Sequence, residues 1–444
     1  MKEAKPNQRN KKLPVMVFIH GGAFVALSAN EYQPYILMNE DIVLIVIQYR
    51  LGIFGFLSTE DSVMPGNMGL KDQQLALKWV KENIESFGGD SNSITIFGES
   101  AGGASVHYQV LSPGSKGLFN RAIIQSGTAL CPWASNKNHR KFAIETGQEF
   151  NCSIDFGTEK YRECMQNVNP YYLTIAASQT KVWGLSYYYV LPRVDGEFID
   201  EAPEILMRKG KYNKVDIIQG ITRDEGGLDF YFDYLEPNRK EKFNNNFEYY
   251  GPISLFLQNE ENSVELARQV YQHYLHREDV NLSDDDWKEI MDINSDRLFR
   301  VAHDTVANFF AKDQNIKFYT YQFDHLANVS LATILPGSAR RDVIAHSDDL
   351  KYFFYGGGVL KTKLESENDL KMGKIFLNLW INFAKTGNPT PPDSDFKWHT
   401  TTSNSFRYLS LTTSPVMKED SFQKVKCKII FFLIHYNIHY RIIC

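Results

Sequence analysis

Long hydrophobic runs and long stretches of one charge sign are missing from this sequence. The formal net charge is −5 over 444 residues, and no cluster of lysine and arginine is long enough to indicate nucleic-acid binding. The start, Met1–Lys12, is polar and basic and lacks the apolar core of a signal peptide. Polar side chains follow the apolar run Ile429–Ile434, so it is too short for a membrane span or a lipid-anchor signal. These absences predict no nucleic-acid partner and no membrane span.

Cysteine is scarce, with five residues in the chain. Cys152 and Cys164 lie 12 positions apart, which fits either a small disulfide loop or two separate thiols. Acceptor sequences for N-glycosylation begin at Asn151, Asn281 and Asn328. They have a meaning only in a secreted protein, so these features alone leave the compartment open.

Linkers, internal repeats and low-complexity segments are also missing, which favours one domain with long helical insertions. Short, continuous apolar runs are typical of strands covered on both faces, as in parallel sheets. They occupy Val15–Ile19, Ile42–Ile47, Ile94–Phe97, Ala122–Ile124, Val215–Ile218 and Phe318–Tyr321. Helices are indicated at Leu70–Phe87, Ala101–Val110, Val264–Leu275, Asp296–Ala311 and Leu370–Lys385. Strands alternating with helices predict an α/β fold with a mostly parallel central sheet flanked by helices.

The stretch FGESAGG, Phe97–Gly103, places Ser100 between a predicted strand and a predicted helix. A strand that runs straight into a helix must turn sharply, and Gly98 and Gly102 permit this because they carry no Cβ. The residue at the tip is pushed outward, where its hydroxyl can act as a nucleophile. Such pentapeptides also arise by chance, so the rest of the chain has to supply a base, an acid and oxyanion-binding groups.

A glycine-rich loop, HGGAF at His20–Phe24, follows the predicted strand Val15–Ile19. In open α/β sheets, functional groups gather beyond the carboxyl ends of the strands. Glycines there leave backbone N–H groups free to point at a developing oxyanion, whereas the alternative is a plain tight turn. Because Ser100 is expected at the same edge, we interpret this loop as an oxyanion loop.

Two acids and two histidines are candidates for the remaining roles. Asp224 and Glu225 follow the strand Val215–Ile218, His325 lies just past the strand Phe318–Tyr321, and His346 lies on a later loop. The residues alone do not separate either pair. Every combination gives the chain order serine, acid, histidine, which is the order of α/β-hydrolases.

Several motifs occur together and in a fixed order: Asn67–Gln73, Phe87–Asp90, Gly98–Gly103, Gln125–Gly127, Pro192–Gly196 and Lys385–Pro389. This set closely resembles the signatures of the type-B carboxylesterases, the relatives of cholinesterases, from about Leu13 to about Met417. The resemblance implies an α/β-hydrolase fold over residues 1–425, with an atypical tail at 426–444 outside the fold. Family members carry a longer segment before the glycine loop, which this sequence lacks.

The resemblance assigns roles that the residues left open. It implies that Ser100 is the nucleophile, that Glu225 of the Asp-Glu-Gly motif is the acid, and that His346, before an acidic pair and an aromatic run, is the base. The oxyanion donors it implies are the backbone N–H groups of Gly22, Ala23 and Ala101.

Further residues take supporting roles from the same resemblance. Ser126 matches a serine that supports the acid, and Glu99 matches a carboxylate beside the nucleophile. Trp133 lies in a stretch that resembles an acyl pocket. Cys152 and Cys164 match a family disulfide.

The resemblance therefore implies a serine esterase that splits small-molecule carboxylic esters through an acyl-enzyme, with no metal or cofactor, in a parent protein that is secreted. One alternative is a non-catalytic cholinesterase-like adhesion or receptor ectodomain, although such relatives usually lose a member of the triad. A specialised juvenile hormone esterase is the other, although that group typically has glutamine at the position of Glu99.

Overall fold

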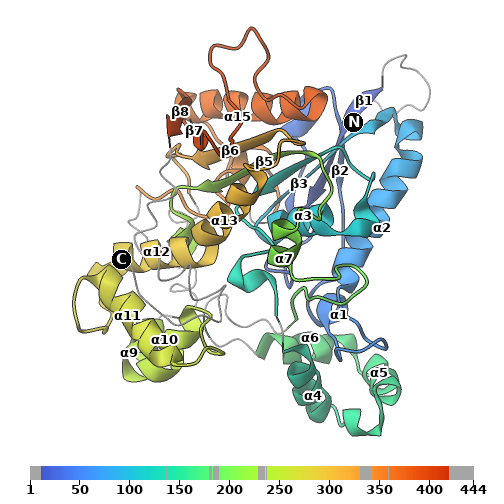
Figure 1. Cartoon of the computed structure of the whole chain (residues 1–444), viewed down its shortest axis with the longest axis vertical. Helices are drawn as coiled ribbons and strands as arrows, with labels where there is room; N and C mark the ends of the chain where they lie inside the picture. Colours follow the sequence, from blue (N-terminus) through green and yellow to red (C-terminus); the bar gives the residue numbers. More distant parts are fainter. Residues whose placement is uncertain are drawn as a thin grey trace.

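The central feature of the computed structural model is one mostly parallel sheet of eight strands (Figure 1). The structure describes residues 12–419 except 137, 180–182, 184–189, 229–235, 237, 331–341 and 359. The strands are β1 Leu13–Ile19, β2 Val43–Val46, β3 Gly89–Glu99, β4 Arg121–Gln125, β5 Asp216–Thr222, β6 Phe318–Phe323, β7 Arg407–Leu411 and β8 Val416–Glu419. Their order is β2-β1-β3-β4-β5-β6-β7-β8, with only the β7–β8 pair antiparallel. The predicted α/β-hydrolase fold is confirmed.

The apolar runs are continuous because both faces of the sheet are buried. On β1, Val15 and Val17 belong to one apolar cluster, while Met16 and Phe18 belong to a second cluster on the opposite face. Successive side chains of a strand point to opposite faces, so an uninterrupted apolar run supplies both cores at once.

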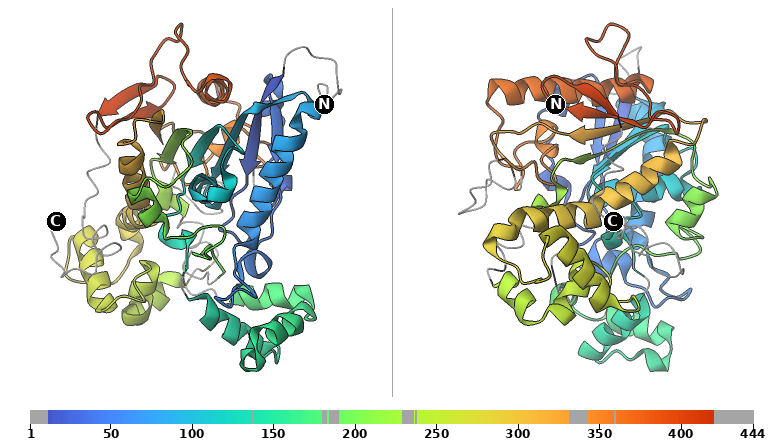
Figure 2. Two further views of the ribbon diagram at one scale, coloured as in Figure 1. Left: turned by 45° about the vertical axis from the view of Figure 1, so that its right-hand side comes forward. Right: turned by 60° about the vertical axis from the view of Figure 1, so that its left-hand side comes forward.

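Helices cover both faces of this sheet. They are α1 Gly52–Phe56, α2 Met68–Asn83, α3 Ala101–Leu111, α4 His139–Glu149, α5 Thr158–Gln166, α6 Pro170–Gln179, α7 Pro203–Arg208, α9 Arg239–Asn245, α10 Phe247–Ser254, α11 Ser263–Leu275, α12 Trp287–Ser295, α13 Val301–Phe310 and α15 Glu367–Thr386. Helix α15 lies on one face, and α2, α3, α7 and α13 lie on the other (Figures 1 and 2). No helix among the described residues has both the length and the hydropathy needed to cross a bilayer.

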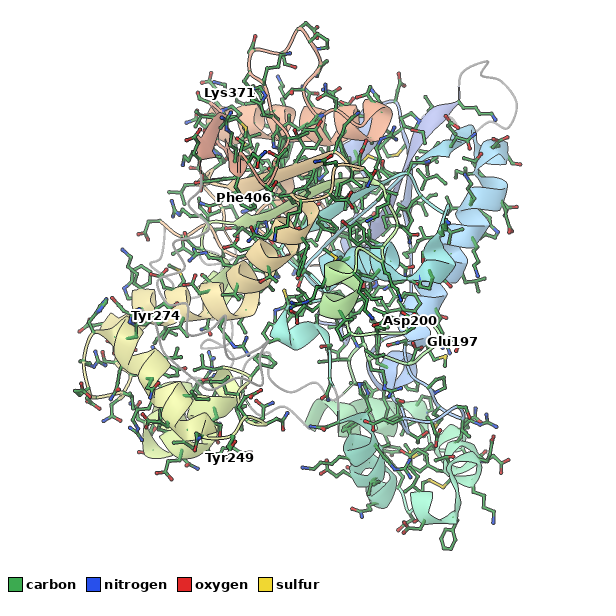
Figure 3. All side chains as sticks on the ribbon, in the orientation of Figure 1. Glu197, Asp200, Tyr249, Tyr274, Lys371 and Phe406 are labelled. Atoms are coloured by element: carbon green, nitrogen blue, oxygen red, sulfur yellow. A yellow bond between two sulfur atoms is a disulfide. The ribbon has the colours of Figure 1, made fainter. Side chains whose placement is uncertain are left out.

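Two helical insertions project from the same end of the sheet (Figure 1). Helices α9 to α12 pack around a separate apolar cluster that includes Phe243, Phe247 and Tyr271. Tyr249 and Tyr274 mark α10 and α11 of this insertion in Figure 3. The long helical insertions predicted from the sequence are thus confirmed.

The second insertion, α4 to α6, contains a disulfide. Cys152 and Cys164 are bonded, with their Cα atoms 5.6 Å apart. Of the two readings left open by the spacing, the disulfide loop is therefore correct, as the resemblance implied. Cys131 is buried and unpaired.

One edge strand of the sheet was predicted from the sequence, and the strands at the other edge were not. Strand β2, predicted as Ile42–Ile47, lies at one edge. Strands β7 and β8 continue the sheet past β6 to the other edge and were not predicted. The tail expected at 426–444 lies outside the described residues.

The turn from β3 into α3 confirms the sharp strand-to-helix corner. Ser100 has φ 61° and ψ −124°, a conformation that L-residues seldom adopt. A Cβ on Gly98 would lie 2.6 Å from the Ile19 carbonyl oxygen, and one on Gly102 would lie 2.0 Å from the same atom. Backbone therefore packs directly on backbone at this corner, and glycine is needed at both positions.

We expect Gly102→Ala to disrupt the corner, because the added methyl group meets rigid backbone rather than a movable side chain. The matched control is Gly373→Ala in α15, where a Cβ has ordinary contact with Tyr352 at 3.4 Å. That change should stabilise the protein by about 1 kcal/mol through helix propensity. Denaturant unfolding of both variants is the measurement, and equal stability would contradict the packing argument.

Removal of the disulfide by the double change Cys152→Ser and Cys164→Ser should lower the unfolding free energy. Closing so short a loop contributes about 3 kcal/mol in the chain-entropy account. Urea unfolding against the wild type gives the difference, and mass spectrometry of non-reduced peptides establishes the bond. Unchanged stability of the variant, together with two free thiols in the wild-type protein, would refute a stabilising Cys152–Cys164 disulfide.

Candidate active site

Ser100 occupies the corner between β3 and α3 with its hydroxyl uncommitted to the helix. It is the N-cap residue of α3, a position where serine side chains usually accept a backbone N–H, yet here the side chain makes no capping hydrogen bond. Its backbone is held on both sides, since its N–H donates to Gln125 and its carbonyl accepts from Ala104, each at 2.9 Å. The corner thus presents the hydroxyl while fixing the main chain.

The glycine loop after β1 lies directly against this serine. A Cβ on Gly21 would come within 3.2 Å of the Ser100 Cβ. Gly22 and Ala23 follow with φ 104° and 55°, so the chain turns tightly through the left-handed region. Ala101 opens α3, and the first N–H groups of a helix have no partner within the helix. The loop that carries Gly22 and Ala23, and the first residue of α3, therefore both adjoin Ser100.

His346 and Glu225 form a buried hydrogen-bonded pair. Nδ1 of His346 lies 2.6 Å from Oε2 of Glu225. His346 is 3% exposed and Glu225 is 0% exposed. The other carboxylate oxygen of Glu225 accepts the N–H of Thr222 at 2.8 Å, which fixes the acid in the turn after β5. Sequence positions 121 apart are thus joined in one contact.

The rejected candidates have other partners. Asp224 binds the Arg223 guanidinium at 2.7 Å and accepts the N–H of Ile344 at 2.9 Å, so it ties the histidine-bearing segment to the end of β5. His325 lies 2.8 Å from Asp369 at the start of α15. The pair that the resemblance chose is the pair that the structure brings together.

Glu99 contacts the other nitrogen of the same imidazole. Its Oε1 lies 3.1 Å from Nε2 of His346, and it accepts the Ser347 hydroxyl at 2.6 Å. Glu99 is 2% exposed. Both ring nitrogens of His346 therefore face carboxylate oxygens, and among the described residues no hydrogen bond joins the imidazole to the Ser100 hydroxyl.

Burial and proximity shift the pKa values of this group. Burial is the main cause that raises the pKa of Glu99 above its ordinary range, and the nearby His346 offsets part of the shift. Burial alone would lower the pKa of His346, but the carboxylates of Glu99 and Glu225 outweigh it and raise that pKa. Burial also raises the pKa of Asp349 to about 6. The site therefore tends to retain a proton between its carboxylates and its imidazole.

Trp133 is linked to the base by Phe299, a residue that the sequence did not single out. The indole N–H of Trp133 donates to the Leu298 carbonyl at 2.9 Å, and the ring is 5.6 Å from that of Phe299. Phe299 in turn packs on the His346 imidazole at 4.6 Å. Phe299 belongs to a π-helical turn, Asp296–Arg300, inside a run predicted simply as helix, so no local signal distinguished it.

Ser126 follows β4 and is buried, but its hydroxyl has no hydrogen-bond partner among the described residues. Its support of the acid stays a prediction. Ser347 and Asp349 are the other groups that sequence reasoning passed over. Asp349 accepts the side-chain amide of Gln125 at 2.8 Å, and only its position after the histidine motif could have pointed to it.

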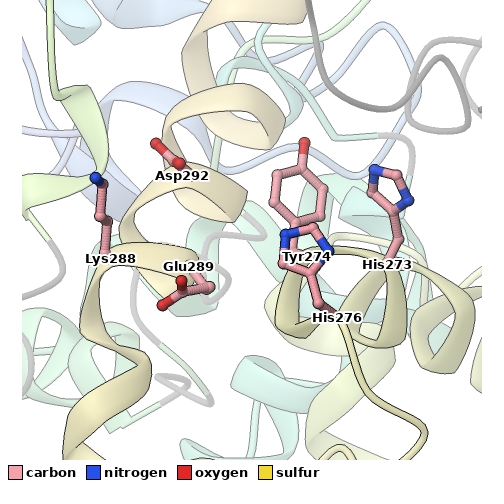
Figure 4. Close-up of a pocket in the computed structure, with 6 residues that line it drawn as sticks. All are labelled: His273, Tyr274, His276, Lys288, Glu289 and Asp292. Carbon is pink, nitrogen blue, oxygen red and sulfur yellow. The ribbon is translucent and has the colours of Figure 1, made fainter.

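Two cavities lie apart from these residues. One is polar and is lined by His273, Tyr274, His276, Lys288, Glu289 and Asp292 (Figure 4). A larger one, about 690 Å³, lies near the amino ends of β4 and β5 and includes Phe119, Leu206 and Val215. Neither contains a predicted site residue. Within the described part of the chain, no group of three or more His, Cys, Asp or Glu side chains is arranged to hold a metal ion.

Known proteins resemble this chain over nearly its whole length. Venom carboxylesterase-6 of Apis mellifera is 34% identical over 426 residues, which is 91% of this chain and 73% of that protein. Bile salt-activated lipase of Homo sapiens is 34% identical, covering 91% of this chain and 54% of the lipase. Juvenile hormone esterase of Tribolium castaneum is 34% identical, covering 85% and 68%.

The family assignment follows from a broader match. The sequence profile described as "Carboxylesterase family" matches residues 2–430. This range contains the serine corner, the glycine loop and the His346–Glu225 pair described above. The chain therefore belongs to the Carboxylesterase family.

Proposed function

We propose that this protein is a serine esterase that hydrolyses small-molecule carboxylic esters, with Ser100, His346 and Glu225 as its catalytic triad. The observation that carries the proposal is the buried 2.6 Å contact between His346 and Glu225, at the same edge of the sheet as the half-buried corner of Ser100. Membership of the Carboxylesterase family supports the reaction class.

The reaction proceeds in two halves. Ser100 attacks the ester carbonyl as Nε2 of His346 takes its proton, and the N–H groups of Gly22, Ala23 and Ala101 stabilise the oxyanion. The tetrahedral intermediate expels the alcohol, which receives the proton from His346. Water then attacks the acyl-enzyme by the same route and releases the acid. Glu225 keeps the proton on Nδ1 and stabilises the imidazolium.

Glu99 has a distinct part in this scheme. When Nε2 of His346 is protonated, the adjacent carboxylate stabilises the imidazolium. To act as a base, His346 must give up this proton and turn Nε2 toward Ser100. Catalytic hydrogen bonds are commonly long before substrate binds and tighten in the complex. The raised pKa of Glu99 makes it a suitable acceptor for that proton.

The acyl group of the substrate would lie against Trp133 and Phe299, two adjacent aromatic rings of which Phe299 packs on the base. We propose a secreted protein, because a disulfide is present and because one relative is named as a venom carboxylesterase. The three glycosylation acceptors, Asn151, Asn281 and Asn328, are exposed. Peptide mapping of protein from a secretory host tests whether they carry glycans.

Replacing Ser100 by Ala should abolish covalent labelling by an organophosphate and lower turnover by several orders of magnitude, since the triad acts as a unit. His346→Ala should be about as damaging, whereas His325→Ala should leave the triad intact. The measurements are labelling stoichiometry by mass spectrometry and hydrolysis of 4-nitrophenyl butyrate. Persistent labelling of the Ser100 variant would identify another nucleophile, and an unlabelled wild type would favour the adhesion-protein alternative.

Glu99→Gln should move the acidic limb of the kcat/KM profile to lower pH. A carboxylate beside Nε2 raises the pKa of His346, so its loss lowers that pKa and leaves the imidazole unprotonated over a wider range. Removing an opposite charge at this distance shifts a pKa by roughly 1–3 units. The control is Asp224→Asn, whose carboxylate is already paired with Arg223. An unchanged or upward shift in the Glu99 variant would contradict the assignment.

A further inference from the structure

The peptide unit between Gly21 and Gly22, in the loop beside Ser100, has no Cβ at either end. Glycine occupies both ends, because a Cβ on Gly21 would lie 2.7 Å from the Glu99 carbonyl oxygen and one on Gly22 would lie 2.1 Å from that of Ala26. Two adjacent glycines have wide rotational freedom, so such a peptide can turn over between two orientations. Glycine has no side chain whose contacts could fix the orientation of this peptide, so another interaction must fix it.

His20 supplies that interaction. Its Nδ1 lies 2.8 Å from the Gly21 carbonyl oxygen, and the residue is fully buried. A carbonyl oxygen only accepts hydrogen bonds, so Nδ1 carries the proton and donates it. Burial lowers the pKa of His20, which keeps the imidazole neutral. Its Nε2 therefore carries no proton.

The imidazole is itself held in place. The Tyr49 ring stacks on it at 4.5 Å with an interplanar angle of 25°, and the Tyr49 hydroxyl donates to the His20 carbonyl at 2.8 Å. Tyr32 lies nearly parallel to the imidazole at 6.3 Å. Both tyrosines are buried, so the ring has little room to rotate away from Gly21.

We propose that His20 is a positioning residue that holds the N–H of Gly22 toward the oxyanion site. The described chain has no cis peptide bond, so the Gly21 carbonyl and the Gly22 N–H point in opposite directions across one planar unit. Fixing the oxygen by a hydrogen bond therefore fixes the direction of the N–H. With the peptide reversed, the negative end of the carbonyl would face the developing oxyanion.

This inference rests on the proposed function, because it presumes that Gly22 is an oxyanion donor. It adds no proton transfer, and His20 touches neither substrate nor Ser100 in the scheme. Losing one oxyanion donor lowers kcat by roughly 10²–10³. The effect of removing the His20 donor should therefore appear in kcat rather than in KM.

The test compares His20→Phe with His20→Asn. Phenylalanine keeps an aromatic ring against Tyr49 but has no donor, whereas the asparagine amide nitrogen is the same number of bonds from the backbone as Nδ1 and can donate. With 4-nitrophenyl butyrate, His20→Phe should lose about 10²-fold in kcat at nearly constant KM, and His20→Asn should recover about tenfold of that loss. Affinity for an aryl trifluoromethyl ketone, which forms an oxyanion on the serine, should fall and recover in parallel.

A purely structural role predicts the reverse order, because phenylalanine fills the space and asparagine leaves a void. Equal or higher kcat in His20→Phe than in His20→Asn would thus overturn the proposal, as would losses confined to KM. If neither variant folds, Tyr49→Phe is measured instead, because it removes the hydroxyl that donates to the His20 carbonyl. A lower kcat at unchanged KM would support the positioning role of His20, and a wild-type kcat would refute it. Failure of the proposed function is separate, since it would appear as a wild type that an organophosphate does not label.

Discussion

Close backbone packing around Ser100 is the constraint on which the rest of the site depends. The end of β1 meets Gly98 and Gly102 so tightly that no Cβ fits, and the Ser100 N–H is bonded to the end of β4. Three neighbouring strands and the first turn of α3 therefore fix one another at a single point. The strained φ of Ser100 persists because this surrounding packing over-determines it, not because serine favours it. A nucleophile placed in this way cannot relax toward the helix that it caps.

The same packing brings several ionisable groups together out of water. One imidazole lies between Glu225 and Glu99, both almost fully buried, and Asp349 is a third buried acid nearby. Two carboxylates and one imidazolium would leave a buried net charge, which is costly in a medium of low polarity. The pKa values of Glu99 and His346 are raised because binding a proton lowers this buried negative charge. Glu225, Glu99 and His346 therefore titrate together, and a proton cannot be assigned to one of them alone. Whichever group holds the proton before substrate binds thus sets the pH range of the reaction.

Sequence reasoning reached the features that have a local signal. The strands from β1 to β6 were found because burial on both faces leaves continuous apolar runs, and the serine corner was found because its glycines are unavoidable. Strands β7 and β8 were missed because polar residues such as Ser410 and Lys418 interrupt their apolar pattern. The choice between His325 and His346 needed the resemblance, since both follow apolar segments. The two histidines differ in a tertiary contact, because Asp224 pairs with the segment that carries His346.

The insertion α9 to α12 reaches this site through one π-helical turn, Asp296–Arg300. Just before the turn, the Ser295 hydroxyl accepts the N–H of Gly226, next to the acid. In this π turn one backbone carbonyl, that of Leu298, accepts from the Trp133 indole, while the next side chain, Phe299, lies on the base. This one turn therefore joins the insertion to the acid loop, to the base and to the acyl-pocket wall, which the sheet also holds through Asp224 and Glu99.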